Sequence, residues 1–192
     1  RIYKAERIIT KSWDDIFQVK NSLNGKINNN TRYHDGRLVQ IVDVETMLVD
    51  AFPWLEDEKV NELDSVEKIN SDKTVLLAED SPSAMKMMKR ILDKLEVNYH
   101  PFVNGQLLLD YLQEHDESQV GLIITDLEMP VTSGFEVIKQ VKNSKNYSHI
   151  PIIVNSSMSG SSNEQMAQSL NAQGFISKSN PKELKEVIEE YL

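Results

Sequence analysis

The feature that most constrains the fold of this chain is a series of short apolar runs that each stop at a polar or charged residue. The residues at their ends are, in chain order, Glu79, Asp80, Asp126, Ser156 and Lys178. Apolar runs of this length are typical of strands buried on both faces of a parallel sheet. In open parallel sheets the ligand crevice lies beyond the carboxyl ends of the strands. The sequence therefore predicts one rim with three carboxylates, a hydroxyl and an ammonium group, which suits a divalent cation and a phosphoryl group.

Strand and helix patterns alternate five times from residue 74 to the end of the chain. This alternation predicts an α/β domain with a parallel sheet over residues 74–192. The expected strands are residues 74–78, 97–102, 121–125, 152–155 and 174–176. The expected helices are residues 83–95, 105–114, 134–141, 164–171 and 181–191, the last of which opens with a proline.

The first 52 residues have a different pattern, which reads as mostly β. Strands are expected over residues 1–9 and 37–42, a loop over the Asn/Gly-rich run 24–30, and a short helix over 44–52. About 50 residues with two strands cannot bury a sufficient core alone. We therefore expect this segment to need partner strands and the chain to be a piece of a longer polypeptide.

Residues 53–73 read as an acidic linker between the two parts. Seven acidic side chains dominate this stretch, and a few apolar positions such as Leu63 and Ile69 interrupt it. We expect the linker to act mainly as a spacer. Its apolar positions are suited to docking against either neighbouring domain.

Composition excludes several classes of function. The net charge is −9 and no Lys/Arg cluster offers the electrostatic footprint of a phosphate-backbone partner, which argues against nucleic-acid binding. The absence of cysteine excludes thiol catalysis and thiolate metal sites, and it fits a reducing cytoplasm. No apolar stretch approaches the roughly 18–20 residues that cross a bilayer, so we expect no direct membrane insertion.

Glu79, Asp80 and Asp126 are the candidate metal ligands. Carboxylates placed this close together repel one another unless a cation lies among them. Mg²⁺ fits such a site, since it prefers oxygen ligands and keeps several waters and a phosphate oxygen in an incomplete protein shell. The backbone carbonyl of Glu128, two residues past Asp126, is a further candidate ligand. The structural alternative for the acidic pair is that Asp80 or Ser81 merely caps the following helix.

Lys178 and Ser156 are the candidate partners of a phosphate group. Lys178 directly follows an apolar run at the same rim, where it can neutralise oxygens that the metal leaves exposed. Ser156 can donate its hydroxyl to a phosphoryl oxygen, or it is simply a turn or helix-cap serine. Phe175, an aromatic residue near a strand start, is first of all a candidate for the core.

Together these residues resemble the receiver domains of two-component response regulators, over about residues 74–192. The resemblance is carried, in order, by Glu79, Asp80, the run 126–130, Gly134, Ser156, Phe175 and Lys178. It implies a doubly wound (βα)5 fold with sheet order 2-1-3-4-5. Two departures stand out: Ser179 where these domains usually have proline, and Glu128 beside the path of the hydrolytic water, which affects the lifetime of a phosphorylated state.

The resemblance also implies a role for each site residue. Asp126 would accept a phosphoryl group from a histidine kinase, and Glu79 and Asp80 would hold Mg²⁺. Ser156 and Phe175 would form the switch pair that reports phosphorylation to the face made by the last two helices and the last strand. Such a domain is not an enzyme beyond self-catalysed phosphotransfer and dephosphorylation.

Residues 1–52 resemble the C-terminal part of a β-barrel-type, CheW-like coupling domain. The resemblance rests on residues 13–16 and, more strongly, on residues 36–45. Coupling segment, acidic linker and receiver in this order resemble the chemotaxis adaptors of the CheV type. That implies a chemotaxis histidine kinase as partner, chemoreceptors bound through the coupling domain, and a cytoplasmic location at chemoreceptor arrays.

Two other functions remain open at the level of sequence. The receiver could act mainly as a phosphate sink that competes for kinase phosphoryl groups. The chain could instead be a metal-dependent phosphohydrolase with Asp126 as nucleophile, although Glu128 stands where such enzymes place a second aspartate. A flavin carrier of similar fold is disfavoured, because the residues after Asp80 do not form a glycine-rich phosphate loop.

Overall fold

The computed structural model describes residues 16–18, 27–32, 38–42, 51, 68–115, 117–156, 161–178 and 180–192. Contacts between Cα atoms divide the chain into two units, residues 1–53 and residues 54–192. Each unit is described by itself.

The first unit contains a three-stranded antiparallel sheet. Its strands are β1 (Ile16–Gln18), β2 (Ile27–Arg32) and β3 (Leu38–Val42), in the order β1-β2-β3. Strand β3 lies within the strand that was predicted over residues 37–42. The loop predicted over residues 24–30 is wrong from Ile27 onward, because Asn29 and Asn30 pair with both β1 and β3 and Ile27 pairs with β3. Residues 24–26 lie outside the described residues. Pairing with two neighbours overrides the low strand propensity of asparagine.

Two further sequence predictions for the first unit concern residues that the structure does not describe. The strand expected over residues 1–9 lies wholly outside the described residues. Of the helix expected over residues 44–52, only Ala51 is described, and it is helical.

The second unit is built around a five-stranded parallel sheet. Its strands are β4 (Thr74–Ala78), β5 (Asn98–Phe102), β6 (Val120–Thr125), β7 (Ile152–Ser156) and β8 (Gly174–Ser177). They lie in the order β5-β4-β6-β7-β8, and all four pairings are parallel. Numbered within the unit, this is the order 2-1-3-4-5, so the predicted α/β fold is confirmed.

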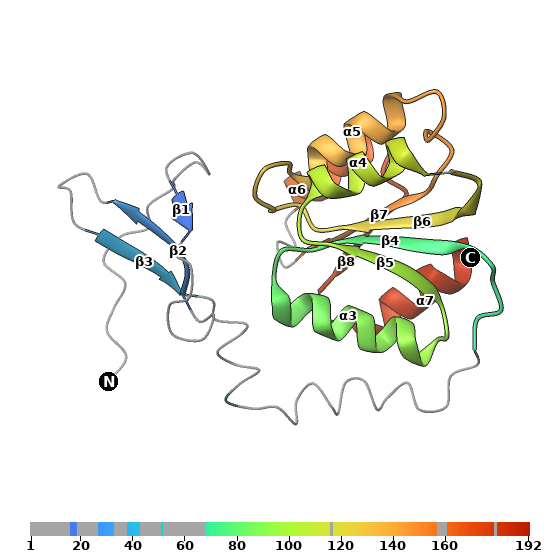
Figure 1. The fold of residues 1–192 in the computed structure, drawn as a ribbon, viewed down its shortest axis with the longest axis horizontal. Helices are drawn as coiled ribbons and strands as arrows, with labels where there is room; N and C mark the ends of the chain where they lie inside the picture. Colours follow the sequence, from blue (N-terminus) through green and yellow to red (C-terminus); the bar gives the residue numbers. More distant parts are fainter. Residues whose placement is uncertain are drawn as a thin grey trace. The chain divides into compact units, whose positions relative to one another are not determined.

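Helices cover both faces of this sheet (Figure 1). They are α3 (Pro82–Lys94), α4 (Gly105–Glu114), α5 (Gly134–Asn143), α6 (Ser161–Ser169) and α7 (Pro181–Tyr191), with a 3-10 turn η3 at Glu117–Gln119. Helices α3 and α7 lie on one face, and α4, α5 and α6 lie on the other. The predicted bounds of α4 and α7 agree with the structure residue for residue.

Local sequence explains where the helices begin and end. Ser81 caps α3 by accepting a hydrogen bond from the amide of Ala84, and Pro82 follows at the first helical position. Asn180 and Pro181 do the same for α7. Helix α6 ends two residues before the predicted end at residue 171. Its chain leaves the helix through Asn171, which adopts the left-handed conformation typical of helix ends.

The alternation of side chains along the strands forms a core on each side of the sheet. Along β4, Val75 and Leu77 point to the face covered by α3 and α7, while Leu76 and Ala78 point to the opposite face. All four side chains are fully buried. Because both faces of the central strands are covered, their sequences are continuously apolar, which is the pattern that predicted the sheet.

The last residues of the stretch expected as a linker contact α3 within the second unit. The amide of Ile69 donates a hydrogen bond of 3.0 Å to the carbonyl of Leu95, directly after α3. Ile69 also packs against the core beneath α3, and Lys68 forms an ion pair with Glu96. The chain is therefore held against the C-terminal end of α3 several residues before β4 begins.

Candidate functional site

The ends of β4 and β6 bring the acidic residues together. The two strands are neighbours, and Ala78 pairs with Thr125 at their last residues. The amide of Asp126 donates a hydrogen bond of 2.9 Å to the carbonyl of Ala78, which extends the ladder to the first acidic residue. Glu79 and Asp80 follow β4 at the same level. Parallel register thus places three carboxylates at one rim, although Glu79 and Asp80 precede Asp126 by 47 and 46 residues in the chain.

The carboxylates of Glu79, Asp80 and Asp126 form one cluster. One oxygen of each lies within 4.8 Å of the others. Glu79 and Asp126 are buried, with exposed fractions of 1% and 5%, and Asp80 is partly exposed. The cluster therefore has a buried floor and an open side, an arrangement that leaves room for water or a phosphate oxygen beside a bound ion.

Lys178 bridges the two buried carboxylates from the end of β8. Its Nζ donates hydrogen bonds to Oε1 of Glu79 at 2.9 Å and to Oδ2 of Asp126 at 2.8 Å. Its side chain is only 11% exposed. A buried pair of carboxylates without a cation would be strongly destabilising, so Lys178 supplies part of the charge that the cluster requires.

Burial and charge shift the pKa values of this pair. Burial raises the pKa of Glu79 to about 8, an effect that the Lys178 ammonium counteracts and the Asp126 carboxylate reinforces. Burial lowers the pKa of Lys178, but the attraction of Glu79 and Asp126 outweighs it, and the net pKa is raised above that of an ordinary lysine. Lys178 is therefore a fixed positive charge, whereas Glu79 takes up a proton near neutral pH.

The donor set fits a hard divalent cation. Oε2 of Glu79 is buried and accepts no hydrogen bond from the described residues, although Lys178 Nζ also lies 2.9 Å from it. The ammonium meets this oxygen as an ion pair and not as a hydrogen-bond donor, so the oxygen keeps acceptor capacity for a further partner. A buried carboxylate oxygen with spare acceptor capacity, next to two more carboxylates, is what Mg²⁺ requires.

Backbone contacts orient Asp126. Its Oδ1 accepts a hydrogen bond of 2.7 Å from the amide of Leu127, and the hydroxyl of Thr125 donates to its carbonyl at 2.9 Å. Gly134, the first residue of α5, packs against the same carbonyl: a Cβ at this position would lie 2.0 Å from that oxygen. Only glycine allows α5 to start this close to the acidic rim.

The acidic rim also contains contacts that sequence analysis did not find. The amide of Leu127 holds Asp126, and the amide of Ser81 donates to Oε1 of Glu79 at 3.0 Å. Both donors are backbone N–H groups, which every residue type except proline supplies, so no sequence signal identifies them. Ser81 rather than Asp80 caps α3, which leaves the Asp80 carboxylate in the cluster.

The other predicted site residues lie at or near the same edge of the sheet. Ser156 is the last residue of β7, is 1% exposed, and lies opposite Ser177 in the register with β8. Phe175 is half-buried in β8 and packs against the core beneath α4, α5 and α6. The side chain of Glu128 is exposed in the loop after Asp126. Ser179 lies outside the described residues.

The loop that follows Asp126 contains an unusual residue. Val131 has a positive φ of 70° and its side chain is 82% exposed. A β-branched residue in the left-handed region is strained, and such strain clusters at functional sites. The neighbouring Thr132 hydroxyl donates to Gln106 at 3.0 Å, which ties this loop to α4.

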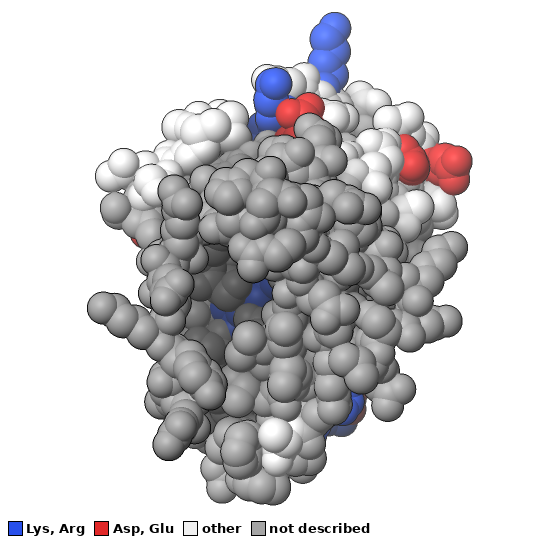
Figure 2. Space-filling view, turned by 90° about the vertical axis from the view of Figure 1, so that its left-hand side faces the viewer, with Lys and Arg blue, Asp and Glu red and all other residues white. Residues whose placement is uncertain are grey.

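Charged side chains on the visible surface are of both signs. In Figure 2 both blue and red side chains appear among the described residues of the visible face. Among the residues that the structure describes, no helix is long and apolar enough to cross a membrane.

Comparison with protein families identifies a match in the second unit. Residues 75–189 match the response regulator receiver domain family. Over its whole length the chain is 58% identical to the chemotaxis protein CheV1 of Helicobacter pylori and 48% identical to CheV2 of the same organism. It spans 62% of the first relative and 63% of the second, which is less than two thirds of either protein.

Solved structures with the same fold include another chemotaxis protein. The chemotaxis response regulator CheY4 of Vibrio cholerae superimposes with a TM-score of 0.57 at 26% sequence identity. The similarity covers 64% of this chain and 100% of that protein.

Proposed function

The chain belongs to the response regulator receiver domain family and is of the CheV type, and from this we propose that Asp126 accepts a phosphoryl group from a histidine kinase. The observation that carries the proposal is the convergence of three carboxylates and one lysine at the ends of β4, β6 and β8. A general metal site needs no ammonium group among its ligands, whereas a phosphoryl acceptor benefits from one.

The transfer would proceed as an in-line displacement. A carboxylate oxygen of Asp126 attacks the phosphorus of the phosphohistidine, the new O–P bond forms, and the P–N bond breaks as the imidazole leaves. Hydrogen bonds from the amide of Leu127 and from Lys178 hold the two oxygens of Asp126 before the reaction. Because the carboxylate is already oriented, little reorganisation remains for the chemical step.

Glu79, Asp80 and Asp126 would hold Mg²⁺, with the carbonyl of Glu128 as a further candidate ligand. The ion would offset the negative charge that the phosphoryl oxygens bring to the acidic cluster. The buried Oε2 of Glu79 supports this assignment, since a cation would satisfy its unused lone pair.

Lys178 and Ser156 would contact the phosphoryl oxygens after transfer. The Lys178 ammonium is already 2.8 Å from Asp126, so a small displacement would allow it to bind an oxygen of the new acyl phosphate. The Ser156 hydroxyl, at the end of β7, would donate to another. Movement of β7 would then change the packing of Phe175 on the adjacent β8, because Val154 pairs with Phe175 in the register.

The whole protein would act as a phosphorylation-regulated chemotaxis adaptor. The CheV relatives support a chemotaxis response-regulator adaptor, and a coupling segment before the receiver would dock the kinase and the chemoreceptors. On this proposal the receiver adjusts that docking at the receptor arrays in the cytoplasm.

The direct test is phosphotransfer. We expect purified chemotaxis kinase with radiolabelled ATP and Mg²⁺ to label this chain, and Asp126→Asn to reduce the label at least about 100-fold because it removes the nucleophile. Asp93→Asn, on the exposed side of α3, is the matched control and should be labelled like the wild type. Equal labelling of Asp126→Asn and wild type would show that the acceptor is another residue.

A further inference from the structure

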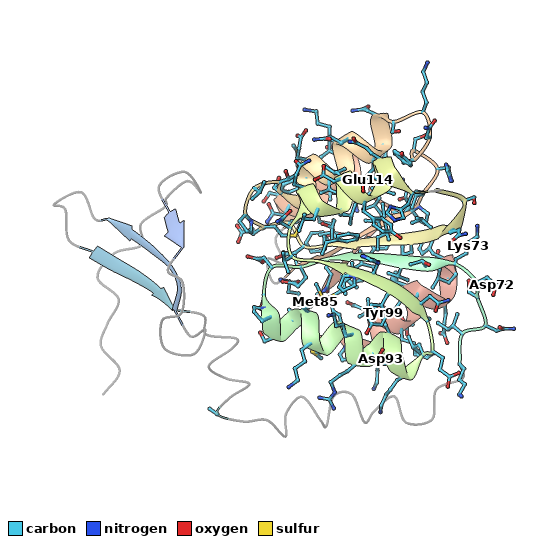
Figure 3. The ribbon with its side chains drawn as sticks, in the orientation of Figure 1. Asp72, Lys73, Met85, Asp93, Tyr99 and Glu114 are labelled. Carbon is cyan, nitrogen blue, oxygen red and sulfur yellow. The ribbon has the colours of Figure 1, made fainter. Side chains whose placement is uncertain are left out.

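A groove lies between α3 and the edge strand β5, beside the acidic cluster. Its volume is about 510 Å³. Figure 3 shows Met85 and Asp93 toward opposite ends of α3, with Tyr99 between the helix and the sheet. The Tyr99 hydroxyl donates to Asp93 at 3.0 Å, and both residues line the groove toward the C-terminal end of α3. Toward the N-terminal end of α3 the lining includes Glu79 and Asp80 of the acidic cluster.

The middle of the groove is basic. Lys86, Lys89 and Arg90, three residues within about one and a half turns of α3, contribute to its lining, and Met85 and Tyr99 add apolar surface. A groove with apolar walls and a cluster of cations suits an amphipathic segment with acidic side chains. It does not suit a small polar metabolite, which would need convergent polar groups in an enclosed site.

A segment of that chemistry begins at the end of the groove. Residues 54–67 contain six acidic residues and one lysine, a net charge of −5. Val60, Leu63 and Val66 recur every third residue, in step with Ile69. Residues at such spacing share one face of a helical turn. Ile69 itself packs against the core beneath α3.

The attachment of residues 68 and 69 determines where the segment starts. The hydrogen bond from Ile69 to Leu95 and the ion pair of Lys68 with Glu96 hold the chain at the C-terminal end of α3. Helix α3 has 13 residues and is therefore about 20 Å long. Fourteen residues span about 21 Å as a helix and roughly 45 Å when extended, so either conformation reaches from Lys68 to Asp80.

We propose that residues 54–67 dock in the groove between α3 and β5, with their acidic side chains against Lys86, Lys89 and Arg90. The occupant is this chain's own segment because the attachment at Ile69 keeps it at high effective concentration beside the groove. Because the groove extends to Glu79 and Asp80, docking would also couple to the phosphorylation of Asp126. That coupling rests on the proposed function, whereas the docking does not.

Hydrogen exchange of the 192-residue chain tests the docking. In the wild type we expect the amides of residues 58–66 to exchange at least about tenfold more slowly than in an unstructured peptide of the same sequence. The double variant Lys89→Glu/Arg90→Glu should lose this protection. The control Lys139→Glu/Lys145→Glu carries the same charge change on exposed positions away from α3 and should keep it.

Restoring the charge pair separates docking from other effects. Adding Glu62→Lys and Asp64→Lys to the Lys89→Glu/Arg90→Glu variant should recover the protection. Salt near 1 M, where the Debye length is about 3 Å, should weaken it in the wild type, which tests the proposal even if the variants fold poorly. Exchange of β4 and β6 amides reports whether each variant is folded.

Several outcomes would overturn the proposal. The first is exchange of residues 58–66 in the wild type that is as fast as in the free peptide. The second is equal protection in the Lys89→Glu/Arg90→Glu variant. The third is protection that appears only at high protein concentration, which would assign the groove to a second copy of the chain. The measurement is repeated in Asp126→Asn. Protection that persists there supports docking even if the phosphotransfer experiment fails, so the two proposals fail independently.

Discussion

Single residues decide the electrostatics of the acidic rim. Lys178 neutralises part of the charge on Glu79 and Asp126, but one ammonium cannot balance three carboxylates. Burial raises the pKa of Glu79 and the nearby Asp126 carboxylate adds to the effect, so Glu79 takes up a proton in place of a cation. Proton and Mg²⁺ therefore compete for the same carboxylate.

This competition predicts that Mg²⁺ binds more tightly as pH rises. The pKa of Glu79 is about 8, so below that pH a proton must leave before its oxygens can bind the ion. Affinity should fall by up to about tenfold for each pH unit below 8 and level off above it. Calorimetric titration between pH 6 and pH 9 measures this, with Glu79→Gln expected to bind weakly and to lose most of the dependence.

The same pKa has a consequence for stability. Glu79 has a higher pKa folded than unfolded, so without a cation the free energy of unfolding should decrease as pH rises from about 4.5 to about 8. Mg²⁺ should offset this decrease at the upper end of the range. An Mg²⁺ affinity that is flat from pH 6 to pH 9 would contradict both expectations.

Lys178 should matter more for the response to a phosphoryl group than for metal binding. Beryllofluoride, a phosphoryl mimic, should shift NMR resonances near Ser156 and Phe175 in the wild type. Lys178→Ala should retain Mg²⁺ binding, because it removes a competing cation from Glu79 and Asp126, but should lose most of that shift. Lys139→Ala, on exposed α5, is the control, and an undiminished shift in Lys178→Ala would refute the role.

At the scale of secondary-structure elements, the close contact between α5 and the end of β6 is the most restrictive. A Cβ on Gly134 would lie 2.0 Å from the carbonyl oxygen of Asp126, and backbone atoms cannot move aside as a side chain can. The same loop holds the strained Val131 and the amide that binds Asp126. The start of α5 therefore sets the position of the carboxylate.

We accordingly expect Gly134→Ala to destabilise the domain by at least about 2 kcal/mol, since overpacking against backbone forces the helix to shift. Urea unfolding followed by circular dichroism measures the change. Gly174→Ala is the control, because its added Cβ would meet only the flexible end of Ile153 at 2.9 Å. An equal decrease in the free energy of unfolding in Gly134→Ala and Gly174→Ala would contradict the expectation that the contact of Gly134 with Asp126 is the more restrictive one.

At the scale of the whole molecule, the proposed adaptor function requires the two units to influence each other. Phosphorylation would change the docking of residues 54–67 or the surface formed by α6, β8 and α7, and so bias the protein between two states. The chain covers less than two thirds of its CheV relatives, so the full-length protein is the appropriate material.

The measurement is the affinity of the full-length protein for the kinase–receptor complex with and without beryllofluoride. We expect a change of at least about fivefold, which corresponds to a coupling free energy near 1 kcal/mol. Asp126→Asn should show no change. Equal affinities in the wild type would mean that the receiver does not control coupling, and would favour the phosphate-sink function.

Much of the fold is predictable from local sequence. Helices α4 and α7 begin and end at the predicted residues, because the groups that start them, Asn104, Asn180 and Pro181, act within one turn of the chain. The five strands are equally local, since burial on both faces requires continuous apolar runs. The rim of polar residues follows from the strand ends and the parallel sheet alone.

The remaining features depend on contacts between distant parts of the chain. Residues 27–32 are a strand because β1 and β3 pair with them, although their own sequence favours a loop. The bridge from Lys178 to Glu79 and Asp126 joins residues 99 and 52 positions apart. The raised pKa of Glu79 and the packing of Ile69 beneath α3 likewise result from burial. Burial is a property of the packed molecule and not of any single segment.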